Sequence, residues 1–121
     1  MSLRTDRVAS LVKEEMGLFI SREFSDPAYG LITVMEVKMS PDLRIAKVYV
    51  SILAAPEVKT AAMKMLEDRK GEVRFFIGSH LRMKFTPAIH FYLDETLDRV
   101  DKINRLLQQI HKDDDSKAGQ P

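Results

Sequence analysis

The sequence predicts an α+β protein, a two-layer sandwich in which helices cover one face of a three-stranded sheet. Apolar residues recur every three or four positions in four segments, which is typical of one face of a helix. They alternate with other residues in three segments, as strands with one buried face do. The chain has 121 residues without an internal repeat or linker, so a single domain is expected.

A helix and two strands are expected in the first half of the chain. The helix covers about residues 4–24, and the segment SDPAYG ends it because Pro27 cannot continue a helix. Strands are expected at residues 31–39 and 43–53, and the short turn SPD between them indicates a β-hairpin. The apolar face of the helix consists of Val8, Leu11, Val12, Met16, Phe19, Ile20 and Phe24.

The second half is expected to contain three helices and one strand. A helix is expected from about Pro56 or Glu57 to Lys70, with Pro56 at its start because proline is favoured in the first turn. A third helix follows Gly71 and reaches about residue 84, and residues 85–94 form the third strand. A last helix begins between residues 94 and 96, with a stripe made of Leu97, Val100, Ile103, Leu107 and Ile110. Residues 113–121 are charged and lack large apolar side chains, so a domain of residues 1–112 with a disordered tail is expected.

Gly71 stands between two helical segments, although glycine in a helix interior costs about 1 kcal/mol relative to alanine. Arg69 and Lys70 precede it directly, and Arg74 follows within one turn. Glycine allows a sharp bend and a close approach to the backbone, and the N-terminus of a helix attracts phosphate. We therefore expect a helix–glycine–helix junction that presents positive charge to RNA.

The net charge of +1 conceals an uneven distribution. Residues 69–84 contain five Lys or Arg and one acid, whereas residues 94–115 contain seven acids and four Lys or Arg. On the third helix, Arg74 and Arg82 would share a face and His80 would neighbour Lys84. The alternative for such a cluster is a solvated helix face. The predicted RNA-binding residues are Arg69, Lys70, Gly71, Arg74, His80, Arg82 and Lys84.

The remaining composition argues against an enzyme. The chain has no cysteine, which excludes disulfides, thiolate nucleophiles and cysteine-based zinc sites. It has no phosphate-binding loop, and its histidines, His80, His90 and His111, lack metal-ligand spacing. Asp94, Glu95 and Asp98 fit the acidic start of a helix better than a cation site. No catalytic residue, metal, cofactor or small-molecule substrate is expected, and the absence of a signal peptide or a long apolar run indicates the cytoplasm and no membrane.

Three stretches together resemble bacterial ribosome-binding factor A over about residues 4–111: DPAYG (26–30), MSPDLRIAKVYVS (39–51) and GEVRFFIGSHLRMKFTPAIHFYLDET (71–96). The resemblance implies a type II KH-like fold, with the order α-β-β-α-kink-α-β-α. In that family a kink between two helices, often Ala-x-Gly, replaces the GxxG loop of other KH domains. Arg69, Lys70 and Gly71 occupy the kink here, with Arg69 in the alanine position.

The resemblance also implies a function. Such a protein is a monomeric, non-enzymatic factor without a cofactor that binds free small (30S) ribosomal subunits near the 5′-terminal helix of 16S rRNA. It aids rRNA processing, subunit maturation and cold adaptation. The alternatives are a generic single-strand RNA-binding KH-like module, a protein–protein adaptor that uses the acidic last helix, and a small metal-dependent hydrolase around Asp94 and Asp98. A steep salt dependence of binding would distinguish RNA recognition from an adaptor role.

Overall fold

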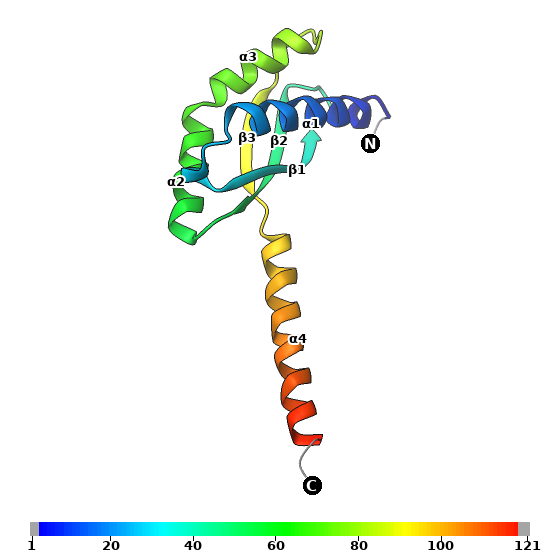
Figure 1. Cartoon of the computed structure of the whole chain (residues 1–121). Helices are drawn as coiled ribbons and strands as arrows, with labels where there is room; N and C mark the ends of the chain where they lie inside the picture. The colour runs from blue at the N-terminus through cyan, green and yellow to red at the C-terminus, as the bar shows by residue number, and fades with distance from the viewer. Residues whose placement is uncertain (1–2, 119–121) are drawn as a thin grey trace.

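The structure is a computed structural model that describes residues 3–118, apart from the side chains at positions 97, 98, 101 and 111–118. It confirms the expected order of helices and strands (Figure 1). The elements are α1 (Leu3–Glu23), the short 3-10 helix η1 (Pro27–Tyr29), β1 (Leu31–Met39), β2 (Ile45–Leu53), α2 (Pro56–Asp68), α3 (Lys70–His80), β3 (Ala88–Leu93) and α4 (Thr96–Ala118).

The three strands form one mixed sheet in the order β1-β2-β3. β1 and β2 pair as an antiparallel hairpin, and β3 pairs parallel to β2 after the chain has crossed over through α2 and α3. A register shift between Val34 and Glu36 leaves Met35 as an extra residue in β1. The central strand is therefore β2, and both β1 and β3 are edge strands.

The core lies between one face of the sheet and the helices α1, α2 and α3. Apart from the register shift in β1, alternate residues of each strand point into it, which is why the period-two pattern of the sequence located all three strands. The strands expected at 43–53 and 85–94 are shorter than expected, because β2 begins at Ile45 and β3 covers Ala88–Leu93. On α1 the buried apolar stripe is Val12, Met16 and Ile20, spaced four apart, and the buried Phe24 continues it directly after the helix; Leu11 lies outside it and is exposed. The opposite face of the sheet carries exposed residues of β1, β2 and β3.

The junction between α2 and α3 lies at Arg69, two residues before the expected glycine. The backbone of Arg69 (φ −105°, ψ 12°) departs from the helical values, and the helix axes diverge there (Figure 1). This bridge-region conformation is open to residues with a side chain, so the bend does not require glycine. Gly71 lies in the first turn of α3, and a Cβ built on it would meet nothing within 4 Å.

The third helix ends at His80, so the expectation that it extends to residue 84 is wrong. Leu81 has an extended backbone (φ −104°, ψ 120°), and Leu81 and Met83 both pack against the core. Residues two apart point to the same side only in extended chain, which makes this packing incompatible with a helix. Pro87, which is fully buried, also disfavours helical geometry at Thr86.

The last helix extends away from the sandwich, and its apolar stripe is not buried (Figure 1). Val100, Ile103, Leu107 and Ile110 are 49% to 57% exposed, because α4 does not fold back over the core. It continues to Ala118, beyond the domain boundary expected at residue 112, and no proline or glycine interrupts the sequence before Gly119. The last part of the expected tail, residues 119–121, lies outside the described residues.

Candidate nucleic-acid interface

The two basic residues at the kink are paired with acids of the two adjoining helices, Glu67 of α2 and Glu72 of α3. The Nε of Arg69 donates to Oε2 of Glu72 at 2.5 Å, and Lys70 forms an ion pair with Glu67. The hydrogen bond to Glu72 raises the pKa of Arg69, and the same bond lowers the pKa of Glu72. The Arg69 guanidinium also lies 4.2 Å from the centre of the Phe24 ring. The net charge of these two pairs is zero, so the kink attracts phosphate less than its sequence suggests.

Arg74 contacts the chain that enters β3 and does not point freely into solvent. Its Nε donates to the carbonyl oxygen of Pro87 at 3.1 Å, and its Nη2 donates to that of Thr86 at 3.3 Å. These bonds connect α3 to the segment of residues 81–87. Arg74 therefore has a structural task, which the pattern of charges did not reveal.

An open aromatic pocket of about 510 Å³ lies beside Gly71. Phe19 stacks on Phe76 with ring centres 4.5 Å apart, and Phe76 stacks on His80 at 3.9 Å. The Nδ1 of His80 lies 3.0 Å from the carbonyl oxygen of Phe76, which holds the imidazole in this position. Phe75 is 78% exposed at the edge of the pocket. Exposed aromatic rings of this kind can stack on an unpaired nucleobase.

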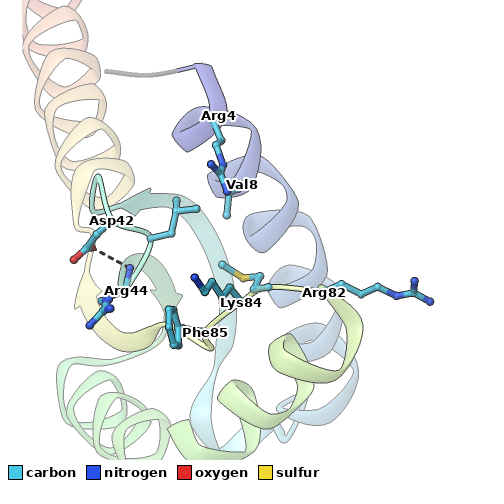
Figure 2. Close-up of a pocket in the computed structure, with 9 residues that line it drawn as sticks. Arg4, Val8, Asp42, Arg44, Arg82, Lys84 and Phe85 are labelled. Atoms are coloured by element: carbon cyan, nitrogen blue, oxygen red, sulfur yellow. Dashed lines mark hydrogen bonds between the residues drawn. The ribbon is translucent and has the colours of Figure 1, made fainter.

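A second pocket, of about 330 Å³, gathers basic side chains from three separate segments (Figure 2). Arg82 and Lys84 come from the loop after α3, Arg4 comes from α1, and Arg44 comes from the turn before β2. The ring of Phe85 lies 4.9 Å from the Arg44 guanidinium and 5.6 Å from the Lys84 ammonium. The Arg82 side chain points outward from the pocket (Figure 2). We call Arg4, Arg44, Arg82 and Lys84 the basic pocket.

The one acid that lines the basic pocket, Asp42, is engaged in the turn between β1 and β2. Its Oδ1 accepts the Ser40 hydroxyl at 2.7 Å and the Arg44 backbone N–H at 3.1 Å. These two hydrogen bonds, the Ser40 bond first, lower the pKa of Asp42. Leu43 adopts φ 61°, a conformation that few non-glycine residues use, and this tight turn directs Arg44 toward the pocket.

The seven predicted site residues therefore fall into separate places. Arg69, Lys70, Gly71 and His80 lie at the kink and its aromatic pocket. We call these four residues, together with Phe75, the kink surface. Arg82 and Lys84 were expected on the third helix beside Arg74 and His80, and this was wrong because they belong to the following loop. The pattern of charges did not include Arg44 or the exposed aromatic residues, which the structure places beside the predicted residues in the two pockets. Aromatic residues next to basic ones, as in Lys84-Phe85, were the available signal.

Asp94, one of the acids weighed as a cation site, has a structural role. Asp94 Oδ1 accepts the backbone N–H of Thr96 at 2.9 Å, at the start of α4, and its hydrogen bonds to Thr96 lower its pKa. The Asp98 side chain lies outside the described residues. Among the side chains that are described, no three His, Cys, Asp or Glu residues gather as metal ligands would. None of the described helices combines the length and the apolar character needed to cross a membrane.

The fold defines the class of protein. The protein has a three-stranded mixed sheet, and helices cover one face of it, including the pair α2 and α3 that bends at Arg69. This arrangement is a KH-like α+β fold. Its basic and aromatic surfaces are of the kind that suits RNA.

Comparison with known sequences identifies the family. The family profile described as Ribosome-binding factor A matches residues 4–107. The chain is also 40% identical over 112 residues to the ribosome-binding factor A of Thermomicrobium roseum, an alignment that covers 93% of this chain and 87% of the relative. This chain belongs to the ribosome-binding factor A family.

Solved structures confirm the fold. A crystal structure of ribosome-binding factor A from Thermus thermophilus has a TM-score of 0.65 at 22% identity, and covers 74% of this chain and 94% of its own. A solution structure of a Thermotoga maritima protein, described as a putative ribosome binding factor A, has a TM-score of 0.63 at 31% identity, covering 76% and 88%. Coordinates of the Thermus thermophilus factor fitted into a cryo-EM map of a 30S complex have a TM-score of 0.62 at 23% identity. They cover 71% of this chain and 90% of the fitted chain.

Proposed function

We propose that this protein binds the free small ribosomal subunit and assists its maturation. The observation that carries the proposal is membership of the ribosome-binding factor A family, with a profile match over residues 4–107. The similar Thermus thermophilus factor, whose coordinates were fitted into a map of its complex with the 30S subunit, gives further support. In this proposal the protein acts in the cytoplasm as a monomer without catalytic activity. It contacts 16S rRNA near the 5′-terminal helix and aids rRNA processing and growth in the cold.

The basic pocket is the proposed phosphate-binding surface. Arg82 and Lys84 are exposed and line one pocket with Arg4 and Arg44, so three segments contribute cations to it, and the Arg82 side chain extends outward from it (Figure 2). Contacts from such residues to phosphates contribute affinity and fix the orientation of the protein, but they carry little sequence information. They also release counterions, which makes binding weaken with salt.

The kink surface is the proposed site for an unpaired base. Gly71 has open space where a side chain would project, so RNA can approach the backbone at the start of α3 closely. Phe75 and the stacked pair of Phe76 and His80 provide aromatic surface beside it. The role of Arg69 and Lys70 is secondary here, because an approaching phosphate must compete with Glu72 and Glu67 for them.

A cosedimentation experiment with free small subunits tests the proposal. The double variant Arg82→Glu/Lys84→Glu should comigrate far less than the parent protein, and its residual binding should depend less steeply on salt. Neither side chain forms a hydrogen bond or ion pair within the described structure, so the fold should be retained. Thermal unfolding would verify this.

The matched control is Lys102→Glu/Arg105→Glu, which makes the same change of charge on the exposed surface of α4. The control should bind small subunits nearly as well as the parent. Equal losses for the two folded variants would contradict a specific role for the basic pocket. Failure of the parent protein to comigrate with small subunits would contradict the proposed function itself.

A further inference from the structure

The open face of the sheet carries a row of basic residues that crosses all three strands. Lys38 of β1 pairs in register with Lys47 of β2, which pairs in turn with His90 of β3. All three are exposed, whereas the residues that follow or precede them along the strands are buried on the core side. Their side chains therefore stand next to one another on the solvent side of the sheet.

Stability of the sheet does not explain this row, because like charges placed directly opposite each other destabilise a strand pair. Lysine on an edge strand often prevents unwanted strand pairing, which could account for Lys38 on β1. It does not account for Lys47, because β2 is the central strand and both of its edges are already paired. An anionic ligand on this face would explain both lysines.

A pair of stacked tyrosines forms the next row of the same face. Tyr49 pairs in register with Tyr92, and their ring centres are 5.4 Å apart with an interplanar angle of 26°. The Lys38 ammonium lies 5.4 Å from the centre of the Tyr49 ring, which links the two rows. Tyr92 is 43% exposed, so a planar group can reach its ring. Residues two apart on a strand are about 6.6 Å apart, so one nucleotide can contact both rows.

We propose that the open face of the sheet is a second RNA-binding surface, separate from the kink surface and the basic pocket. A single-stranded segment places its phosphates over Lys38, Lys47 and His90 and stacks a base on the tyrosine pair. Sheet faces with exposed aromatic residues bind single-stranded RNA by this combination of stacking and charge. Glu36, at the β1 end of the tyrosine row, directs the phosphates toward the lysine row.

RNA fits this face better than a second copy of the chain. Exposed Leu31 and Leu53 near one end of the sheet could support self-association. Lysine is depleted in protein–protein interfaces, however, and a two-fold contact centred on the lysine row would bring like charges together. The charge of the row complements phosphate instead.

Tyrosine fluorescence provides a direct test, since the chain has three tyrosines and no tryptophan. Titration with a short unstructured oligouridylate at low salt should quench the emission of the full-length protein. Tyr92→Leu keeps apolar bulk but removes the stacking ring, so it should reduce the quenching and weaken binding roughly fivefold or more. Lys38→Glu/Lys47→Glu should weaken binding at least as much. It should also reduce the slope of log affinity against log salt by about 1.4, since each single-strand phosphate contact contributes about 0.7.

Two comparisons separate this surface from the others. Lys13→Glu/Lys64→Glu makes the same change of charge at exposed positions of α1 and α2, and should leave the quenching and affinity nearly unchanged. Arg82→Glu/Lys84→Glu should retain the quenching at saturation even where it weakens subunit binding. If Lys38→Glu/Lys47→Glu does not fold, Lys47→Gln replaces it, with an expected change of slope of about 0.7.

The proposal is supported if quenching is lost in the folded sheet-face variants and kept in the controls. Oligouridylate binding with unchanged quenching and affinity in both sheet-face variants would overturn it, whatever happens to small-subunit binding. It would also be overturned if sedimentation equilibrium showed a dimer that these variants dissociate, since the face would then be an interface between copies.

Discussion

Arg74 holds the backbone of Pro87, to whose carbonyl oxygen its Nε donates a hydrogen bond at 3.1 Å. A second bond, from Nη2 to the Thr86 carbonyl oxygen at 3.3 Å, completes a two-point attachment. It joins α3 to the start of β3 across the loop that contributes Arg82 and Lys84 to the basic pocket. The positions of Arg82 and Lys84 therefore depend on Arg74, whose own guanidinium is bonded to the backbone.

Replacing Arg74 with methionine should destabilise the protein by about 1–2 kcal/mol, because two carbonyl oxygens lose a charged donor. This corresponds to a lower melting temperature by several degrees for a domain of this size. Arg82→Met, on the exposed loop that follows α3, is the control and should melt with the parent. Equal melting temperatures for both variants would show that the Arg74 bonds contribute nothing to stability.

Two glycines should respond oppositely to alanine. Gly30 has φ 71°, and a Cβ there would lie 2.6 Å from the Leu53 carbonyl oxygen, so Gly30→Ala should cost more than about 2 kcal/mol. Gly71 lies in α3 with open space around it, so Gly71→Ala should stabilise the fold by up to about 1 kcal/mol. Chemical denaturation measures both changes. A destabilised Gly71→Ala protein would mean that the kink needs glycine after all.

The same Gly71→Ala variant separates folding from binding. If RNA approaches the backbone at the start of α3, the added methyl group occupies the space it needs, and affinity for small subunits should fall while stability rises. Cosedimentation at constant salt measures this loss. Undiminished binding by the stabilised variant would remove Gly71 from the proposed interface.

Asp42 should contribute to stability in a pH-dependent way. The Ser40 hydroxyl and then the Arg44 N–H lower its pKa in the folded protein from the usual 3.8, so the unfolded state binds the proton more tightly. The contribution is therefore present above about pH 4 and is lost as the pH falls through the lower, folded-state pKa. Asp42→Ala should melt below the parent at neutral pH, with a gap that narrows in acid. Ser40→Ala should show the same narrowing, and a constant gap would argue against this linkage.

Removal of α4 should leave the sandwich stable. Its described apolar residues are about half exposed and do not join the core, so a chain that ends after Glu95 should melt within a few degrees of the parent. Circular dichroism should show the loss of helix. Truncation after Lys112 should have still less effect. Loss of cooperative unfolding in the shorter chain would show that α4 packs on the sandwich in solution.

Much of the fold follows from short-range pattern. The strand at residues 31–39 was located to the residue, because alternation with one buried face has a period that only extended chain satisfies. The end of α3 could not be located in this way. Nothing at Leu81 forbids a helix locally, and the helix ends there because Leu81 and Met83 both reach the core from an extended segment.

The candidate interface shows the same difference between local pattern and long-range packing. Periodicity, charge and motif order were sufficient for the element order, the basic character of residues 69–84 and the family, because each depends on neighbours in the chain. Which cations face solvent depended on the folded arrangement. Arg74 is held by a carbonyl 13 residues away, while Arg4, Arg44 and Lys84 come from three separate segments to line one pocket. Such contacts are made when the chain reverses direction and packs its core, so no local pattern in the sequence records them.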